Sequence, residues 1–191
     1  QINYIIFEKV LFQNYDEYQE IESMLSYRQI KAWVNCWRRT VPFYQAFKKK
    51  YQNYELTSFS VNGNKWGMTS NSIHFIDLLN YLTGSTDYQF TTNNVSIMKS
   101  KRDGYYEFVG PLEGVFGKKK IPFSFSSKDA DENTSCLINL KYGKNTISIN
   151  DDEEWWITNL LGNKTKKKKM NIPFQSDMTH HHINDLVEKG A

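Results

Sequence analysis

NKWGMTSNSIHFIDLLNYLTG, residues 64–84, is the stretch around which this chain is organised. Apolar residues recur in it at helical spacing and form one broad face: Ile73, Ile76, Leu78, Leu79 and Leu82. Gly84 follows them, where a left-handed residue commonly ends a helix, and a polar residue among Thr69, Ser70 and Asn71 would cap the start. The sequence therefore predicts a helix from Asn71 to Leu82.

A histidine with polar neighbours lies on this predicted helix. Ser70 is four residues before His74 and Asp77 is three residues after it, so the three share one side of the helix. A carboxylate one turn away can tune a histidine to accept a proton near neutral pH, which makes His74 a candidate catalytic base. A lone histidine on a largely apolar helix is more often a structural residue, and spacing alone leaves both interpretations open.

Length and composition are typical of a soluble globular protein with one good-sized core. The chain has 191 residues and a net charge of +3, which gives no reason to expect a nucleic-acid partner. Cys36 and Cys136 are far apart and lack metal-site spacing, so we expect free thiols in a reducing cytoplasm and no metal. No apolar run is long enough to cross a bilayer and no signal peptide begins at Gln1, so we expect no membrane association.

Residues 1–36 follow a strand–helix–strand pattern. The predicted elements are a strand at Ile2–Phe7, a helix at Tyr15–Tyr27 and a strand at Ile30–Cys36. Glu8 and Lys9 come directly after the first strand, at the end of the strands where open α/β sheets bind ligands. One βαβ unit is too small to stand alone as a domain, and we read the chain as a piece of a longer protein.

The rest of the chain changes to period-two patterns after a short helix. That helix is predicted at Pro42–Tyr51 and a final helix at Gln175–Glu188. The predicted strands are Leu56–Val61, Tyr88–Lys99 with a turn or bulge at Asn93-Asn94, Tyr105–Val109, Gly114–Phe116, Ile121–Ser126, Ser135–Tyr142, Asn145–Asn150 and Trp155–Leu160. Many strands joined by short turns predict an α+β fold with a large, mostly antiparallel open sheet that helices cover.

Three runs invite a functional interpretation that the sequence does not require. KTKKKK, residues 164–169, would bind phosphate, nucleic acid or anionic lipid, but such a run is more often a solvated loop between strands. His180–His182 on a helix point in three directions and cannot hold one ion together, so we expect them on the helix surface. Trp155 and Trp156 would stack on a sugar ring or pack in the core, and both interpretations stay open.

Four segments resemble the Gfo/Idh/MocA family of sugar-type oxidoreductases. WGMTSNSIHFIDLLNYLTG resembles the family's helix with a glycine-rich entry, His-x-x-Asp and an apolar run ending in Gly; Ser70 stands where the family often has aspartate. IIFEKVLFQ resembles its strand followed by Glu-Lys-Pro, with Val10 in place of the proline. VNCWRRTVPFY resembles its strand ending in Asn-Arg-Arg, with Trp37 in place of the asparagine. The helix from Gln175 resembles the family's closing helix.

The resemblance implies an NAD(P)-dependent oxidoreductase that acts on an alcohol of a sugar or sugar derivative. Residues 1–36 would be the C-terminal remnant of its Rossmann-type dinucleotide-binding domain, and residues 37–191 its substrate and oligomerisation domain. None of the 10 glycines makes the family's Gly-x-Gly-x-x-Gly turn, so we expect that turn before Gln1 and expect this fragment alone to be inactive. The resemblance also implies a homo-oligomer that pairs through the open face of the sheet.

The resemblance assigns roles to seven residues. His74 and Lys9 would be catalytic, Glu8 and Lys9 would lie at the cofactor, and the residues implied in substrate binding are Arg38, Arg39, Asn71 and Asp77. Without the resemblance, Lys9 is a lysine after a strand, and Arg38-Arg39 is an exposed basic pair. The alternative class is a binding or scaffold protein that keeps the fold without chemistry, which Ser70 and Val10 favour because both depart from the family pattern.

Overall fold

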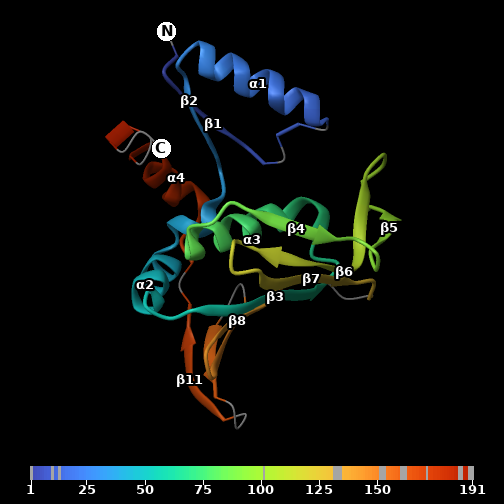
Figure 1. The fold of residues 1–191 in the computed structure, drawn as a ribbon, viewed down its shortest axis with the longest axis vertical. Helices are drawn as coiled ribbons and strands as arrows, with labels where there is room; N and C mark the ends of the chain where they lie inside the picture. Colours follow the sequence, from blue (N-terminus) through green and yellow to red (C-terminus); the bar gives the residue numbers. More distant parts are fainter. Residues whose placement is uncertain are drawn as a thin grey trace.

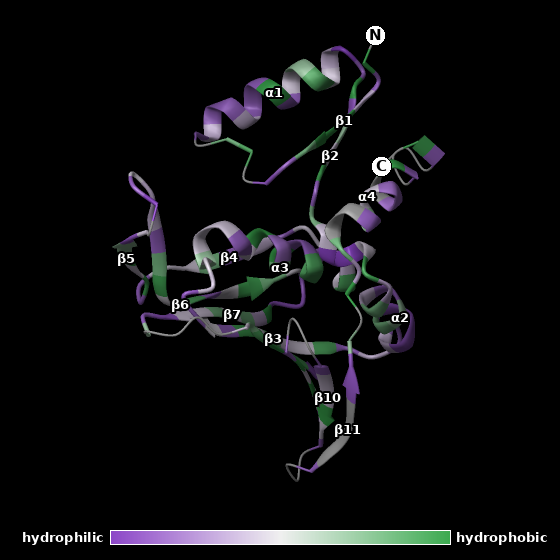
Figure 2. Ribbon diagram, turned by 180° about the vertical axis from the view of Figure 1, so that it is seen from behind, coloured by the Kyte–Doolittle hydropathy of each residue, from purple (hydrophilic) through white to green (hydrophobic). Residues whose placement is uncertain are grey.

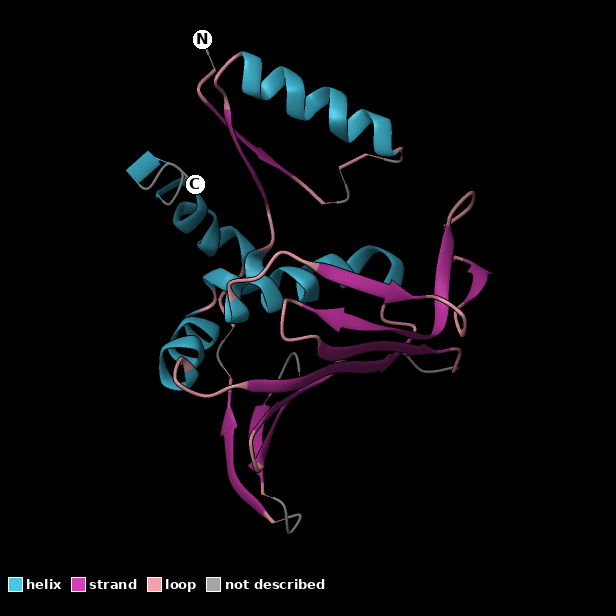
Figure 3. Cartoon of the chain, viewed as in Figure 1, coloured by secondary structure: helices cyan, strands magenta, loops and turns pink. Residues whose placement is uncertain are grey.

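The structure is a computed structural model. It describes residues 2–9, 11–12, 14–100, 102–130, 135–150, 154–159, 163–170, 172–184 and 187–188. Figure 1 shows a curved sheet with helix α3 on one side of it, and the N-terminal elements lie beyond that helix. Figure 3 gives the same view by secondary structure and shows the helices gathered on this side, away from the open face of the sheet.

The N-terminal elements form the predicted βαβ unit. Strands β1 (Tyr4–Phe7) and β2 (Lys31–Val34) pair in parallel, and helix α1 (Tyr15–Tyr27) connects them. Asn14 begins α1 with a capping box that includes the side chain of Glu17. Both strands are shorter than the apolar runs predicted, since residues are paired only from Tyr4 to Phe7 and from Lys31 to Val34.

The rest of the chain builds one large sheet. In spatial order its strands are β11 (Lys164–Lys169), β10 (Glu154–Thr158), β9 (Asn145–Asn150), β8 (Leu137–Tyr142), β3 (Leu56–Asn64), β7 (Ile121–Lys128), β6 (Tyr106–Phe116) and β4 (Tyr88–Thr91), with β5 (Ser96–Lys99) also paired to β6. The pair β3–β7 is parallel and the other pairs are antiparallel. The predicted α+β fold with a mostly antiparallel sheet is confirmed.

Strand β6 was predicted as two strands and is one. Its first half pairs with β5 and its second half with β4, and the partner changes near Gly110 and Pro111. The backbone of Asn94 passes so close to Gly110 that a Cβ there would lie 2.5 Å from the Asn94 carbonyl oxygen, and φ of Gly110 is +95°. A glycine is therefore needed for the chain to turn from β4 to β5 without breaking β6.

The lysine run at residues 164–169 forms a strand, so the prediction of a solvated loop was wrong. The run is strand β11 at the edge of the sheet, paired with β10 and with Lys168 opposite Trp155. Lys168 and Lys169 are exposed, and Figure 2 shows the hydrophilic end of this strand. Backbone pairing to one neighbour is compatible with charged side chains, and edge lysines discourage pairing with further strands.

Helix α3 (Met68–Thr83) packs one face on the sheet. Leu78 and Leu79 are fully buried, and the ring centroids of Phe75 and Phe125 lie 6.1 Å apart. The helix starts before the predicted Asn71, because Gly67 takes the N-cap position with φ of 71° and no side chain caps the start. The predicted polar cap at residues 69–71 was therefore wrong, whereas the left-handed Gly84 at the C-terminal end is confirmed.

Three further helical segments pack together beside the C-terminal half of α3. Helix α2 (Pro42–Tyr51) covers the sheet through Phe43, whose ring centroid lies 5.5 Å from that of Trp155. The 3-10 helix η1 (Trp37–Thr40), which the sequence analysis did not predict, is held to α4 (Gln175–Asn184) by a contact of 3.8 Å between Thr40 Oγ1 and Met178 Sδ. Helix α4 covers the first part of the predicted helix; Val187 and Glu188, at its predicted end, have π-helical conformation, and the intervening residues 185–186 lie outside the described residues.

We predict that Phe125→Ala lowers the free energy of unfolding by about 3–5 kcal/mol, because it leaves a cavity where three rings meet. Phe125 is fully buried and its ring contacts those of Phe59, Phe75 and Phe123. Phe174→Ala is the matched control, since Phe174 is 81% exposed and should change stability little. Denaturant unfolding measures both; similar values for the two variants would contradict the packing described.

Candidate functional site

The carboxyl ends of β1 and β2 bring three polar residues together. Glu8 and Lys9 leave β1, and Asn35 leaves β2. The side-chain amide of Asn35 donates a hydrogen bond to Oε1 of Glu8. The sequence analysis missed Asn35, although a residue that follows the neighbouring parallel strand is expected at the same edge. Glu8, predicted near the cofactor, is thus held by a neighbour from β2.

Lys9 reaches from this edge to helix α3. Its Nζ donates to Oδ1 of Asn71 at 2.8 Å and to the backbone oxygen of Ser70 at 3.3 Å. Nδ2 of Asn71 donates to the backbone oxygen of Trp66 at 2.8 Å, which turns the amide oxygen towards Lys9. Asn71 was predicted to bind substrate, and in the structure its side chain holds Lys9.

His74 is buried close to the positive charges of Lys9 and Arg38. It is 5% exposed, and its ring centroid lies 6.1 Å from that of Trp37. Nδ1 is buried and has no hydrogen-bond partner among the described residues, which does not fit a structural histidine with satisfied hydrogen bonds. Burial lowers the pKa of His74 to about 4, and the positive charges of Lys9 and Arg38 contribute to that shift. The imidazole is therefore neutral at neutral pH.

Arg38 is a buried cation. It is 5% exposed, and its guanidinium carbon lies 4.2 Å from the ring centroid of Phe75 and 4.7 Å from that of Trp37. Such cation–π contacts stabilise a guanidinium away from bulk water. The interpretation of Arg38-Arg39 as an exposed basic pair was therefore wrong, because η1 turns Arg38 inward towards α3.

Arg39 and Asp77 form an ion pair between η1 and α3. Nε of Arg39 donates to Oδ2 of Asp77 at 2.8 Å, Nη2 donates to Oδ1 of Asp77, and Nη2 also donates to Oδ1 of Asn80 at 3.2 Å. Burial raises the pKa of Asp77, and the bond and charge of Arg39 oppose that rise. The carboxylate expected to tune His74 thus pairs with Arg39, while the role of both residues in substrate binding stays a prediction.

The pKa values of Lys9 and Cys36 are also shifted. Burial lowers the pKa of Lys9, while Glu8 and Cys36 oppose the shift and Arg38 adds to it. Cys36 is 4% exposed, and burial together with the charge of Asp77 raises its pKa to about 12. Its thiol is therefore protonated at neutral pH and is no nucleophile. Cys36 and Cys136 are both free, as predicted.

This arrangement suits proton transfer from an alcohol. A neutral imidazole can accept a proton, and an ammonium such as that of Lys9 would stabilise negative charge on an alcohol oxygen bound beside it. Within the described ranges, no group of three or more His, Cys, Asp and Glu residues could hold a metal ion. In the same part of the chain, no helix is both long and apolar enough to cross a bilayer.

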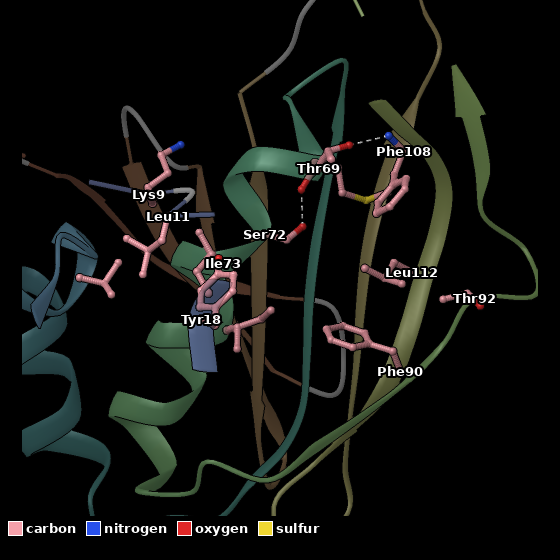
Figure 4. Close-up of a pocket in the computed structure, with 13 residues that line it drawn as sticks. Lys9, Leu11, Tyr18, Thr69, Ser72, Ile73, Phe90, Thr92, Phe108 and Leu112 are labelled. Carbon is pink, nitrogen blue, oxygen red and sulfur yellow. Dashed lines mark hydrogen bonds between the residues drawn. The ribbon is translucent and has the colours of Figure 1, made fainter. Parts of the chain in front are cut away.

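A cavity of about 430 Å³ opens beside Lys9 (Figure 4). It is lined by Lys9, Leu11, Tyr18, Val34, Met68, Thr69, Ser72, Ile73, Ile76, Phe90, Thr92, Phe108 and Leu112. Leu11 and Tyr18 face Phe90 and Leu112 across it, so both parts of the chain supply its walls. The sequence analysis missed this cavity, since its lining residues come from distant segments and share no motif.

No protein-family model and no curated protein matches this chain. Solved structures do match it. A super-repressor mutant of Gal80p from Saccharomyces cerevisiae superposes with a TM-score of 0.70 at 16% identity, over 98% of this chain and 60% of that one. UDP-N-acetylglucosamine 3-dehydrogenase GnnA from Acidithiobacillus ferrooxidans gives 0.66 at 11% identity, over 96% and 62%. A Gfo/Idh/MocA family oxidoreductase from Vibrio cholerae gives 0.60 at 11% identity, over 96% and 60%.

These matches confirm the fold that the resemblance implied. The chain has the α+β fold found in Gfo/Idh/MocA oxidoreductases. It spans 60–62% of the length of these three solved structures. At these identities the likeness shows the fold, which proteins named as dehydrogenases share with a repressor.

We predict that Asn71→Asp raises the pKa of Lys9, because a carboxylate then replaces the amide oxygen 2.8 Å from its ammonium. The Lys9 side-chain signal, followed by NMR as a function of pH, measures the change. Asn62→Asp, on an exposed position of β3, adds the same charge away from the site and should leave the Lys9 titration unaltered. Equal effects of the two variants would show that Asn71 does not hold Lys9.

We also predict that His74→Asn makes stability less dependent on pH between 6.5 and about 4. The pKa of His74 falls from its ordinary 6.5 to about 4 in the folded chain, so in this window the unfolded chain binds a proton that the folded chain does not. The stability of the unmodified protein therefore falls as the pH is lowered through the window. Urea unfolding at several pH values measures both proteins; parallel curves would contradict the burial of a neutral His74.

Proposed function

We propose that this chain is part of an NAD(P)-dependent oxidoreductase of the Gfo/Idh/MocA type, acting on a hydroxyl of a sugar or sugar derivative. Residues 1–36 would complete a dinucleotide-binding domain, and residues 37–191 would form the substrate domain. The observation that carries the proposal is the buried, neutral His74 beside Lys9, at the carboxyl ends of two parallel strands. The same fold in a named sugar-nucleotide dehydrogenase supports it.

The residues present fit the nicotinamide end of such a cofactor. Ligands of open α/β sheets bind at the carboxyl ends of the strands, where Asn35 holds Glu8 and Asn71 holds Lys9. NAD or NADP, when bound, supplies the acceptor for the hydride. The glycine-rich turn for the pyrophosphate would come from residues outside this chain.

In this proposal His74 takes the hydroxyl proton and Lys9 orients the hydroxyl. The neutral imidazole has a free lone pair for the proton, and the unpartnered Nδ1 leaves it free to rearrange its hydrogen bonds when substrate arrives. Lys9, fixed by Asn71, directs an ammonium hydrogen at the substrate oxygen. Arg38 adds a buried positive charge that favours negative charge on that oxygen. In the reverse direction His74 returns the proton.

Arg39 and Asp77 contribute to this site through their position between η1 and α3. Arg38 is next to Arg39 in the sequence, and His74 lies one helical turn before Asp77. The ion pair between Arg39 and Asp77 therefore fixes Arg38 and His74 relative to each other. Both residues are proposed to bind substrate, since their side chains are 19% and 16% exposed. A hydroxyl-rich substrate would compete for the hydrogen bonds that they now make with each other and with Asn80.

A second candidate function is a binding or regulatory protein that keeps the fold without chemistry. Ser70 in place of the family's usual aspartate favours it, and the same fold occurs in a repressor, Gal80p. The sequence before Gln1 discriminates the two functions. An intact Gly-x-Gly-x-x-Gly turn there favours the enzyme, and an eroded one favours the regulator.

We also propose a homo-oligomer that pairs through the sheet face away from α3, in the cytoplasm. Short polar side chains cover that face across three neighbouring strands. Ser148 Oγ donates to Asn139 Oδ1 at 2.7 Å, and Asn139 Nδ2 donates to Ser60 Oγ at 3.5 Å. Such short side chains would let a second sheet approach closely, and the free, buried Cys36 and Cys136 suit a reducing compartment.

We predict that His74→Ala in the complete enzyme lowers kcat by about a hundred- to ten-thousand-fold and changes KM little, as expected for loss of a general base. His74→Asn should fold normally and still be slow. Lys9→Ala should also be slow, because it removes the charge that orients the alcohol. Steady-state kinetics measures all three variants.

The control is His180→Ala, which removes an exposed imidazole on α4 and should leave turnover unchanged. If His74→Ala keeps near-normal kcat and loses only thermal stability, His74 is structural and the enzymatic proposal is wrong.

A further inference from the structure

The cavity beside Lys9 has a lining that suits an apolar group and does not suit a bare sugar. We propose that it receives an aryl or short alkyl substituent of the substrate, carried on the sugar or alcohol whose reacting hydroxyl lies at Lys9 and His74. This inference rests on the proposed function and narrows its substrate class to sugar or alcohol derivatives with an apolar substituent.

The first argument is the chemistry of the walls. Nine of the lining residues are apolar or aromatic: Leu11, Tyr18, Val34, Met68, Ile73, Ile76, Phe90, Phe108 and Leu112. Three large ones stay well exposed in the protein, namely Ile73 at 38%, Phe90 at 37% and Tyr18 at 37%. An apolar occupant would remove this surface from water, which is favourable in proportion to the area buried.

The second argument is that most polar groups of the lining are already engaged. Thr69 Oγ1 accepts a hydrogen bond from the backbone N–H of Phe108 at 2.7 Å, and Ser72 Oγ donates to the backbone oxygen of Met68 (Figure 4). Lys9 donates to Asn71 and Ser70 at the edge of the cavity. A polyhydroxylated ring placed among these walls would bury hydroxyls without partners, which is unfavourable.

The third argument is continuity with the proposed active site. Lys9 both lines the cavity and belongs to the group around His74, so one molecule can occupy the cavity and present a hydroxyl to Lys9. Leu11 and Val34 come from the N-terminal unit, whereas Phe90 and Leu112 come from the large sheet. About 430 Å³ lies within the common range of small-molecule pockets, roughly 300–1,000 Å³.

The first experiment measures binding without turnover. Benzyl alcohol and glycerol are titrated into the protein with ¹³C-labelled isoleucine methyl groups. We expect benzyl alcohol to shift the Ile73 signal saturably, to bind about tenfold or more tightly than glycerol, and to leave the Ile97 signal unmoved. Ile73→Trp fills the cavity and should abolish this preference. Ile97→Trp is the matched control, since Ile97 lies on β5 outside the cavity and is 66% exposed.

The second experiment measures turnover by the complete enzyme. Phenyl and methyl β-D-glucopyranoside are compared as substrates, with benzyl alcohol as competitor. We expect phenyl glucoside to have about tenfold or higher kcat/KM, and Ile73→Trp to remove the difference by raising KM for the phenyl compound. Ile97→Trp should preserve the preference.

The outcomes separate this inference from the proposed function. If benzyl alcohol binds at Ile73 but no alcohol is oxidised with NAD or NADP, the apolar cavity is supported and the oxidoreductase is wrong. If turnover depends on His74 but Ile73→Trp changes nothing, the cavity proposal is overturned and the function stands. If benzyl alcohol leaves Ile73 unmoved and the Ile73 methyls contact protein protons from outside the lining, polypeptide fills the cavity and the proposal is overturned.

Discussion

Helix α3 makes different contacts on each of three faces, and the rest of the structure depends on this constraint. Phe75, Leu78 and Leu79 pack on the sheet. A second face carries the polar residues that contact η1 and Lys9, which follows β1. These residues are Ser70, Asn71, His74 and Asp77. The third face lines the cavity with Thr69, Ser72, Ile73 and Ile76. Residues three and four apart share a face, so one helix of 16 residues orders the core, the polar residues around His74 and the cavity.

The charges around α3 are arranged so that positive charge remains near His74. Asp77, the carboxylate on the same helix face, is engaged by the bidentate contact with Arg39. Glu8 is engaged by Asn35, and Lys9 is held by a neutral amide in place of a carboxylate. The pKa of His74 is therefore set by burial and by cations, and it moves down, where the sequence analysis expected a carboxylate to keep it near neutral.

The sequence predicted helices and strands well where the spacing of apolar residues and the residues at the ends agree. It predicted them less well where contacts with distant segments determine the structure. Helices at Tyr15–Tyr27 and Pro42–Tyr51 were predicted at their observed bounds, because Asn14 begins the first with a capping box and Pro42 begins the second. The lysine run of β11 has no strand pattern and becomes a strand because β10 offers an edge. The resemblance pointed to His74 and Lys9, but Asn35 and the bond from Asn71 to Lys9 depend on contacts between segments far apart in sequence.

The broad apolar face predicted for α3 illustrates what a one-dimensional pattern leaves out. Ile73 and Ile76 were grouped with Leu78, Leu79 and Leu82 as one broad apolar face, whereas in the structure Ile73 and Ile76 line the cavity and Ile76 also packs against the core. Ile73 is 38% exposed and Leu78 is fully buried, although both are large aliphatic residues on one helix. Two adjacent positions, 73 and 74, are about 100° apart around a helix. Ile73 therefore faces the apolar cavity, whereas the next residue, His74, lies buried among the positive charges of Lys9 and Arg38.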